Sequence, residues 1–119
     1  MKVPSFMLKK LYVKGSLEAS GDSFQFKLKN NLATATVVDA PEIYIDGDSV
    51  DAEDISFQVG GGEVAGTGIT EDDPFRLEKG VEVTVASNGL EVGPGAHKLR
   101  IKVATKEWDT LDFEVEDSA

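Results

Sequence analysis

A glycine run near the middle of the chain is the first feature that could do chemistry. It occupies residues 60–68, where five of the nine residues are glycine. Phosphate-binding loops use such glycines to open a helix whose amides point at the anion, and P-loops add a Lys followed by Ser or Thr. Here no helical pattern follows and no lysine is near. We therefore interpret the run as a flexible connection or a bulged strand that crosses between sheets.

Two acidic clusters suggest calcium, because hard cations prefer carboxylate and carbonyl oxygens. If Asp46 is the first position of a calcium loop, Asp51 takes the sixth position, which requires Gly, and Phe57 takes the twelfth, which requires Glu. The favoured interpretation is two solvated turns, and loose binding of a divalent cation where the clusters meet at one end of the fold stays open. The clusters are Asp46, Asp48, Asp51, Glu53 and Asp54, followed by Glu71, Asp72 and Asp73.

Catalytic groups are scarce. His97 is the one histidine, and it opens a predicted strand directly after Pro94 and Gly95, where its ring is expected to cap or pack. The absence of cysteine excludes thiolate nucleophiles, disulfides and Cys-ligated zinc. A site in which Ser or carboxylate groups converge in space stays open. We predict no catalytic, cofactor-binding or metal-ligating residue, no cofactor, and no catalytic activity in this chain alone.

Aromatic side chains could offer a face to a sugar ring, with apolar contact at the centre and polar groups at the rim. The candidates are Tyr12, Tyr44 and Trp108, which are scattered along the sequence. Packing in a core or an interface is therefore the favoured interpretation. A sandwich that binds carbohydrate by itself remains the alternative.

The elements that must position these residues show a period of two. Apolar residues alternate with polar ones at 24–28, 81–85 and 99–103, and more briefly at 43–45, 55–59 and 111–115. Turn residues such as Asp46-Gly47 and Asn88-Gly89 separate the runs about every ten residues. The pattern predicts an all-β fold: one domain over residues 1–119, an antiparallel two-sheet β-sandwich of about eight to nine strands, immunoglobulin-like or jelly-roll.

The first segment is less regular. Met7, Leu8, Leu11 and Tyr12 would share one face of a helix. We rank that helix below a long first strand from Leu8 to Ala19, and a helical start before the strand remains possible.

Composition limits the class of partner. The chain of 119 residues has 22 acidic and 12 basic side chains, a net charge of −10, which would repel nucleic acids and anionic membranes. No apolar run is long enough to span a membrane, and the first ten residues do not resemble a secretory signal. We expect a cytoplasmic protein that binds neither nucleic acid nor membrane.

Residues 1–30 carry six lysines and only two acidic groups, so this basic segment pairs with acidic strands or docks a partner protein.

Several short motifs follow one another from Phe24 onward. They are a Phe24-x-Phe26 strand ending near Asn30, Ile45-Asp46-Gly47, Glu53-Asp54-Ile55-x-Phe57, and Gly89-Leu90-x-x-Gly93-x-Gly95-x-His97. This layout resembles the small β subunit of the C-glycoside deglycosidases. In that family the small subunit is a β-sandwich that associates with an α/β-barrel subunit, and the metal and the chemistry belong to the barrel. The resemblance implies an accessory subunit and transfers no catalytic residue to this chain.

The sequence does not determine a biochemical activity, and the function class is therefore a prediction. We expect a non-catalytic interaction module or accessory subunit that binds a protein partner or associates with itself. Its association surface is expected on an exposed sheet face or on the first strand. The alternative is a separate ligand-binding sandwich for carbohydrate or a loosely bound divalent cation.

Overall fold

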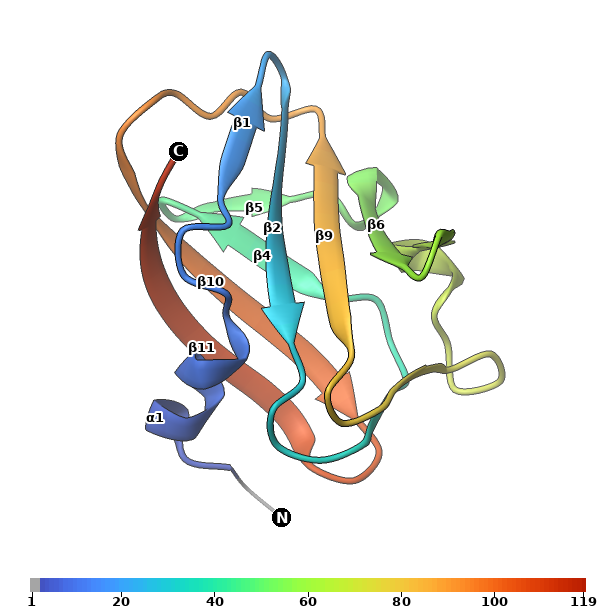
Figure 1. The fold of residues 1–119 in the computed structure, drawn as a ribbon. Coiled ribbons are helices and arrows are strands. Elements are labelled where there is room, and N and C mark those ends of the chain that lie inside the picture. The colour runs from blue at the N-terminus through green and yellow to red at the C-terminus, as the bar shows by residue number, and fades with distance from the viewer. Residues whose placement is uncertain (1–2) are drawn as a thin grey trace.

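The structure, a computed structural model, describes residues 3–119. These residues form eleven strands and a few short helical turns (Figure 1). The strands are β1 (Glu18–Ser20), β2 (Ser23–Lys29), β3 (Ala35–Val37), β4 (Glu42–Ile45), β5 (Asp48–Val50), β6 (Ile55–Val59), β7 (Gly62–Ala65), β8 (Phe75–Leu77), β9 (Glu82–Asn88), β10 (Ala96–Thr105) and β11 (Asp109–Ser118). The helical turns are α1 (Ser5–Leu8) and the 3-10 turns η1 (Lys9–Leu11), η2 (Ala52–Asp54) and η3 (Gly66–Gly68).

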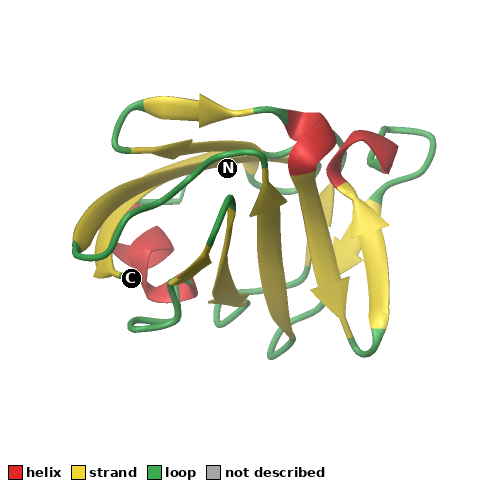
Figure 2. Cartoon of the chain, turned by 90° about the horizontal axis from the view of Figure 1, so that it is seen from above, coloured by secondary structure: helices red, strands yellow, loops and turns green. Residues whose placement is uncertain are grey.

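The strands gather in two antiparallel sheets that face one another (Figure 2). The first sheet has the order β1-β2-β9-β6-β7. The second sheet has the order β5-β4-β10-β3-β8. Its sixth strand, β11, pairs with β10 along the edge opposite to the one that pairs with β4. The predicted all-β sandwich is confirmed. The eleven strands exceed the eight to nine predicted, because pieces such as β3, β5 and β8 are three residues long and too short to show a period of two.

The strand order resolves the choice between the two predicted sandwich types. Immunoglobulin-like domains place strands A, B, E and D in one sheet and C′, C, F and G in the other. The order β1-β2-β9-β6 matches the first set, and β5-β4-β10-β11 matches the second. Phe26 on β2 and Ile101 on β10 lie at the centre of the two sheets and are fully buried. The fold is therefore immunoglobulin-like.

The core follows from the alternation seen in the sequence. On β2, Phe24, Phe26 and Leu28 point inward, and the polar residues between them face outward. Leu99 and Ile101 on β10 do the same from the opposite sheet. The six predicted runs all become strands, because each side chain faces the core or the solvent in turn.

The predicted first strand from Leu8 to Ala19 is wrong over most of its length. Residues 5–11 are helical, Tyr12 makes an isolated bridge to Leu28, and regular strand begins only at Glu18. Gly15 interrupts the strand with a φ of 82°, which a residue with a side chain rarely adopts. The helical alternative, ranked second from the sequence, describes the start of the segment better.

The N-terminal segment closes one side of the sandwich. In Figure 1 it runs between β11, at the edge of the second sheet, and the part of β2 that the short edge strand β1 leaves unpaired. The amide of Val13 donates to the carbonyl of Lys27 on β2 at 3.0 Å. On the other side, the Tyr12 hydroxyl donates to the carboxylate of Asp117 on β11 at 2.6 Å. Within residues 3–119, no helix is long and apolar enough to cross a membrane.

Candidate functional site

An apolar groove lies at the end of the sandwich where β2 and β10 finish. Three separate parts of the chain form it: the N-terminal helical turns, the loop between β2 and β3, and the turn between β10 and β11. It encloses about 320 Å³. Its lining consists of Val3, Met7, Leu11, Asn30, Asn31, Leu32, Ala33, Ala35, Trp108 and Leu111. None of these ten residues is an acid, a base or a nucleophile, so the groove is suited to binding.

The groove continues toward the core. A smaller apolar cavity of about 60 Å³ shares Leu11, Asn30, Ala35 and Leu111 with it. That cavity is also bounded by core side chains such as Phe113, which is 4% exposed. The two sheets are therefore incompletely filled at this end, and an apolar group entering the groove would reach the edge of the hydrophobic core.

Trp108 forms one wall of the groove and is held there by hydrogen bonds. Its indole Nε1–H donates to the carbonyl of Thr34 at 3.2 Å. Its backbone amide donates to the Thr105 hydroxyl at 2.9 Å, and that hydroxyl donates to the carbonyl of Asp109 at 2.8 Å. The ring is half-buried. A fixed aromatic ring offers contact area without losing conformational entropy on binding.

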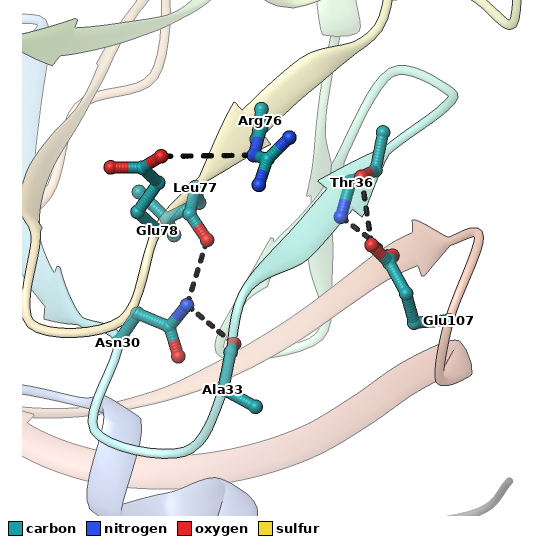
Figure 3. A network of polar contacts seen from close by, with 7 residues as sticks. All are labelled: Asn30, Ala33, Thr36, Arg76, Leu77, Glu78 and Glu107. Carbon is teal, nitrogen blue, oxygen red and sulfur yellow. Dashed lines mark hydrogen bonds and ion pairs between the residues drawn. The ribbon is translucent and has the colours of Figure 1, made fainter.

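A carboxylate clamp fixes the neighbouring wall. Glu107 accepts hydrogen bonds from the amide and the hydroxyl of Thr36, both at 2.8 Å (Figure 3). The hydrogen bond from the backbone amide of Thr36, together with the one from its hydroxyl, holds the pKa of Glu107 below its ordinary value. The turn that carries Trp108 is thereby tied to β3.

Asn30 shapes the loop between β2 and β3. It is 5% exposed, and its amide nitrogen donates to the carbonyls of Ala33 at 2.7 Å and Leu77 at 2.9 Å (Figure 3). Its side-chain oxygen accepts the amide of Leu32 at 3.3 Å. Because these partners occupy its polar atoms, Asn30 positions the loop and has little capacity left for a ligand.

The three aromatic residues considered from the sequence do not form one platform. Tyr12 is buried beside Asp117, and Trp108 lies in the groove. Tyr44 stands on the outer face of the second sheet, where the Arg100 guanidinium lies 5.8 Å from its ring centre. These separate positions give no shared surface for a sugar ring.

The glycine run forms a tight hairpin. Gly60 and Gly61 connect β6 to β7 with φ values of 56° and 86°, the left-handed geometry of a two-residue hairpin turn. Both strands belong to the same sheet, so the predicted crossing between sheets is not found. Gly66 and Gly68 lie in η3, and this turn of three residues is too short to cradle a phosphate.

The acidic cluster after β4 has structural partners. Asp46 occupies the hairpin turn between β4 and β5 with a φ of 52° and accepts the amide of Lys98 at 2.9 Å. Asp51 accepts the amide of Glu53 at 3.0 Å and so caps η2. Within residues 3–119, no three His, Cys, Asp or Glu side chains lie close enough together to hold a metal ion.

His97 lies at the end of the sandwich opposite the groove. Its Nδ1 lies 2.5 Å from a carboxylate oxygen of Asp46, and its Nε2 lies 2.6 Å from the carbonyl of Gly93. Both ring nitrogens face acceptors, which favours the doubly protonated imidazolium. The Asp46 contact, with the Gly93 carbonyl, raises the pKa of His97 above its ordinary value. The ring therefore fastens the hairpin turn to the start of β10.

Sequence reasoning did not identify the groove. The one sequence feature that pointed to the groove was the helical spacing of Met7 and Leu11, which places both on the same face as Leu8. The remaining walls come from residues 30–35 and 108–111, and only the folded sandwich brings them together. The neighbours of Trp108 in the sequence are polar, and its contact with Thr34 could not be predicted from them.

Comparison with known proteins identifies the family. No curated protein matches the chain. The model of the family described as "Hydroxymethylglutaryl-CoA reductase, N-terminal domain" matches residues 7–119. This match overturns the resemblance to the deglycosidase β subunit, whose quoted motifs are turn and strand patterns that many β-sandwiches share. Since the match covers nearly the whole sequence, the chain belongs to the hydroxymethylglutaryl-CoA reductase N-terminal domain family.

Proposed function

We propose that the chain is a non-catalytic accessory module of a hydroxymethylglutaryl-CoA reductase and that the apolar groove contacts the catalytic part of that enzyme. The family to which the chain belongs is a non-catalytic domain of the reductase, which is consistent with an accessory role. The observation that carries the proposal is the lining of the groove, which is almost wholly apolar and has no titratable group. Such a surface suits a contact between proteins.

An exposed aromatic residue beside the groove supports this proposal. Phe6 on α1 is 66% exposed, although its neighbour Leu8 is buried and its neighbour Met7 lines the groove. Covering a phenylalanine side chain contributes about 1.5–3 kcal/mol relative to leaving it in water. Phe6 and the groove together give the N-terminal end a surface that gains free energy when a partner covers it.

The position of the groove also suits the binding of a partner protein. It is built from the loops after β2 and β10, which correspond to the B–C and F–G loops of an immunoglobulin-like sandwich. In antibody variable domains, loops at this end carry the binding surface. The likeness in position supports binding at this end, in place of the sheet face expected from the sequence. Part of the groove lies on the segment that was expected as the first strand.

The test uses Trp108 as its own reporter, because it is the one tryptophan in the chain. The catalytic part of the reductase from the same organism, freed of tryptophan by substitution, is titrated into the chain. We expect the emission of Trp108 to shift to shorter wavelength as the groove loses water. Leu32→Asp should weaken binding at least 10-fold, because a charge then sits in an apolar contact.

The matched control is Gln58→Asp, which adds the same charge at an exposed position on β6. It should bind as the unchanged chain does. The melting temperatures of both variants establish that they remain folded. Equal affinity of Leu32→Asp and the unchanged chain, or no binding of the reductase at all, would overturn the proposal.

A further inference from the structure

The loop between β9 and β10, residues 89–95, crosses the end of the sandwich opposite the groove (Figure 1). Near its start, the amide of Leu90 donates to the carbonyl of Asp22 in the β1–β2 turn at 3.2 Å. Near its end, Gly95 and Ala119 exchange two backbone hydrogen bonds, of 3.4 Å and 3.0 Å. Both ends of the loop are therefore fixed to other parts of the chain.

The middle of the loop, residues 91–94, is held by two contacts of different kinds. The side chain of Val92 is 8% exposed and belongs to the hydrophobic core. The carbonyl of Gly93 lies 2.6 Å from Nε2 of His97. Among the hydrogen bonds within residues 3–119, this is the one that reaches the middle of the loop. The protonation state of the His97 ring therefore decides whether the middle of the loop keeps its polar contact.

The two contacts of His97 need two protons on its ring. Nδ1 lies 2.5 Å from a carboxylate oxygen of Asp46, and Nε2 faces the carbonyl of Gly93. A neutral imidazole carries a single N–H and can donate to one of these acceptors at a time. An ionised carboxylate is the stronger acceptor, so the remaining proton stays on Nδ1. The lone pair of Nε2 then faces the Gly93 oxygen, and the two repel each other.

The charged groups around the ring favour its doubly protonated form, because most of them are acidic. Lys98 follows His97 on β10, so its side chain leaves the opposite face of the strand. The hydrogen bonds to Asp46 and to the Gly93 carbonyl raise the pKa of His97 above 6.5. The loop is therefore held below pH 6.5 and loses its polar contact as the pH rises through the pKa of His97 in the folded chain. The acidic groups are Asp46 and Asp48 at the turn between β4 and β5, Glu91 in the loop, and Asp117, which pairs with His97 across β10 and β11.

We propose that His97 is the pH-sensitive switch of this loop: its ring holds Gly93 while both nitrogens are protonated and releases residues 91–94 when Nε2 loses its proton. The bond to Asp46 persists, so the β4–β5 turn stays attached to the start of β10. The two ends of the loop keep their backbone hydrogen bonds, which confines the change to its middle. This inference does not depend on the proposed function, because the groove lies at the other end of the sandwich.

Nitrogen NMR of the unchanged chain between about pH 5 and pH 9 tests the switch, because this range brackets the titration of histidine. We expect Nε2 to lose its proton and Nδ1 to keep its own. The backbone order parameter of Gly93 should fall from about 0.85 to below about 0.6, with the same midpoint as the titration of the ring. The amide of Lys98, which donates to Asp46 at 2.9 Å, should change little.

Asp46→Asn is the variant that separates the switch from a purely structural role. Asn adopts a left-handed backbone readily, so the φ of 52° at this position is kept. Its oxygen can accept the amide of Lys98, and its NH₂ group can donate to Nδ1 of a neutral His97. The one proton of the neutral ring then stays on Nε2 and keeps the bond to Gly93. In this variant the pKa of His97 should fall, and the order parameter of Gly93 should stay near about 0.85 at every pH above that pKa.

The matched control is Asp48→Asn, which makes the same change at an exposed position on β5. Its loop should lose order at a midpoint within about 0.2 pH units of that of the unchanged chain. Melting curves at pH 6 establish that both variants are folded. The inference is wrong if Gly93 keeps its order after Nε2 of the unchanged chain is deprotonated, or if the neutral ring of that chain keeps its proton on Nε2. It is equally wrong if Asp46→Asn loosens the loop as the unchanged chain does.

Discussion

The hydroxyl of Tyr12 offers a sharp test of how the N-terminal segment is held. Its ring is 8% exposed and lies 5.8 Å from the ring of Phe26, centre to centre. The hydroxyl donates to a carboxylate oxygen of Asp117 at 2.6 Å, and the same oxygen accepts the amides of Gly15 at 3.0 Å and Leu17 at 3.1 Å. Tyr12→Phe removes one oxygen atom and leaves the ring packing in place.

The expected cost follows from the partners that remain. A hydrogen bond to a charged group contributes about 1.5–3 kcal/mol, but Asp117 is partly exposed and keeps two amide donors. We therefore expect Tyr12→Phe to lower the free energy of unfolding by about 1–2 kcal/mol. For a chain of this size that corresponds to a fall in melting temperature of roughly 3–10 °C.

The pH dependence provides a second readout. Partial burial opposes ionisation of Asp117, but hydrogen bonds from Tyr12 and from the amides of Ser118, Leu17 and Gly15 outweigh it and lower its pKa. A lowered pKa stabilises the fold above the unfolded value of 3.8, and the contribution is lost as pH falls through the folded value. The difference between the unchanged chain and Tyr12→Phe should therefore narrow under acid.

Urea denaturation followed by circular dichroism measures these free energies at pH 7 and pH 3. Tyr44→Phe is the control, because its hydroxyl meets only an exposed Glu42 at 3.2 Å and should contribute less than about 0.5 kcal/mol. The reasoning is refuted if Tyr12→Phe and Tyr44→Phe destabilise equally. It is also refuted if the effect of Tyr12→Phe does not diminish down to the lowest pH at which both chains remain folded.

The remaining predictions concern the core, a turn and the histidine. Phe26→Ala should cost about 3–5 kcal/mol in urea denaturation, whereas Asp48→Asn should stay within about 0.5 kcal/mol. Gly89→Ala should cost roughly 1–2 kcal/mol, because φ is 82° and the new carbon would lie 3.0 Å from a carboxylate oxygen of Asp54. NMR titration of His97 should give a pKa above 6.5. The stabilisation of the fold by protonated His97 is complete below pH 6.5 and is lost as the pH rises through the pKa of His97 in the folded chain. His97→Asn should therefore flatten the dependence of the unfolding free energy on pH in that range.

The fold could be read from the sequence wherever one face of a strand is buried. In β2, β9 and β10 each second residue enters the core, and that alternation is a local property of the chain. The hairpin turn at Asp46 could also be predicted from the local sequence, since Asp-Gly is suited to a left-handed backbone. The choice between an immunoglobulin-like and a jelly-roll order was not local, because it depends on which strands pair across the sheet.

The candidate site could not be read in the same way. Met7, Leu32 and Trp108 are far apart in the sequence, and each has an ordinary role when considered alone. The strand predicted from Leu8 to Ala19 also hid the helical turns that form one wall. The tertiary bridge from Tyr12 to Asp117 spans 105 residues and holds that segment in place. No period within the segment itself could indicate it.

This bridge connects the stability of the fold with the proposed docking surface. The N-terminal segment carries Met7 and Leu11 into the groove. Its attachments include, first, the hydrogen bond of Val13 to β2 and, second, the contacts with Asp117 on β11. Loosening the second attachment leaves the other groove walls in place, because Glu107 still clamps Thr36. Tyr12→Phe should therefore weaken reductase binding about 2- to 5-fold at a temperature where the variant is fully folded, by raising the entropy cost of ordering one wall. An unchanged affinity would mean that the bridge serves the fold alone and that the groove is assembled without it.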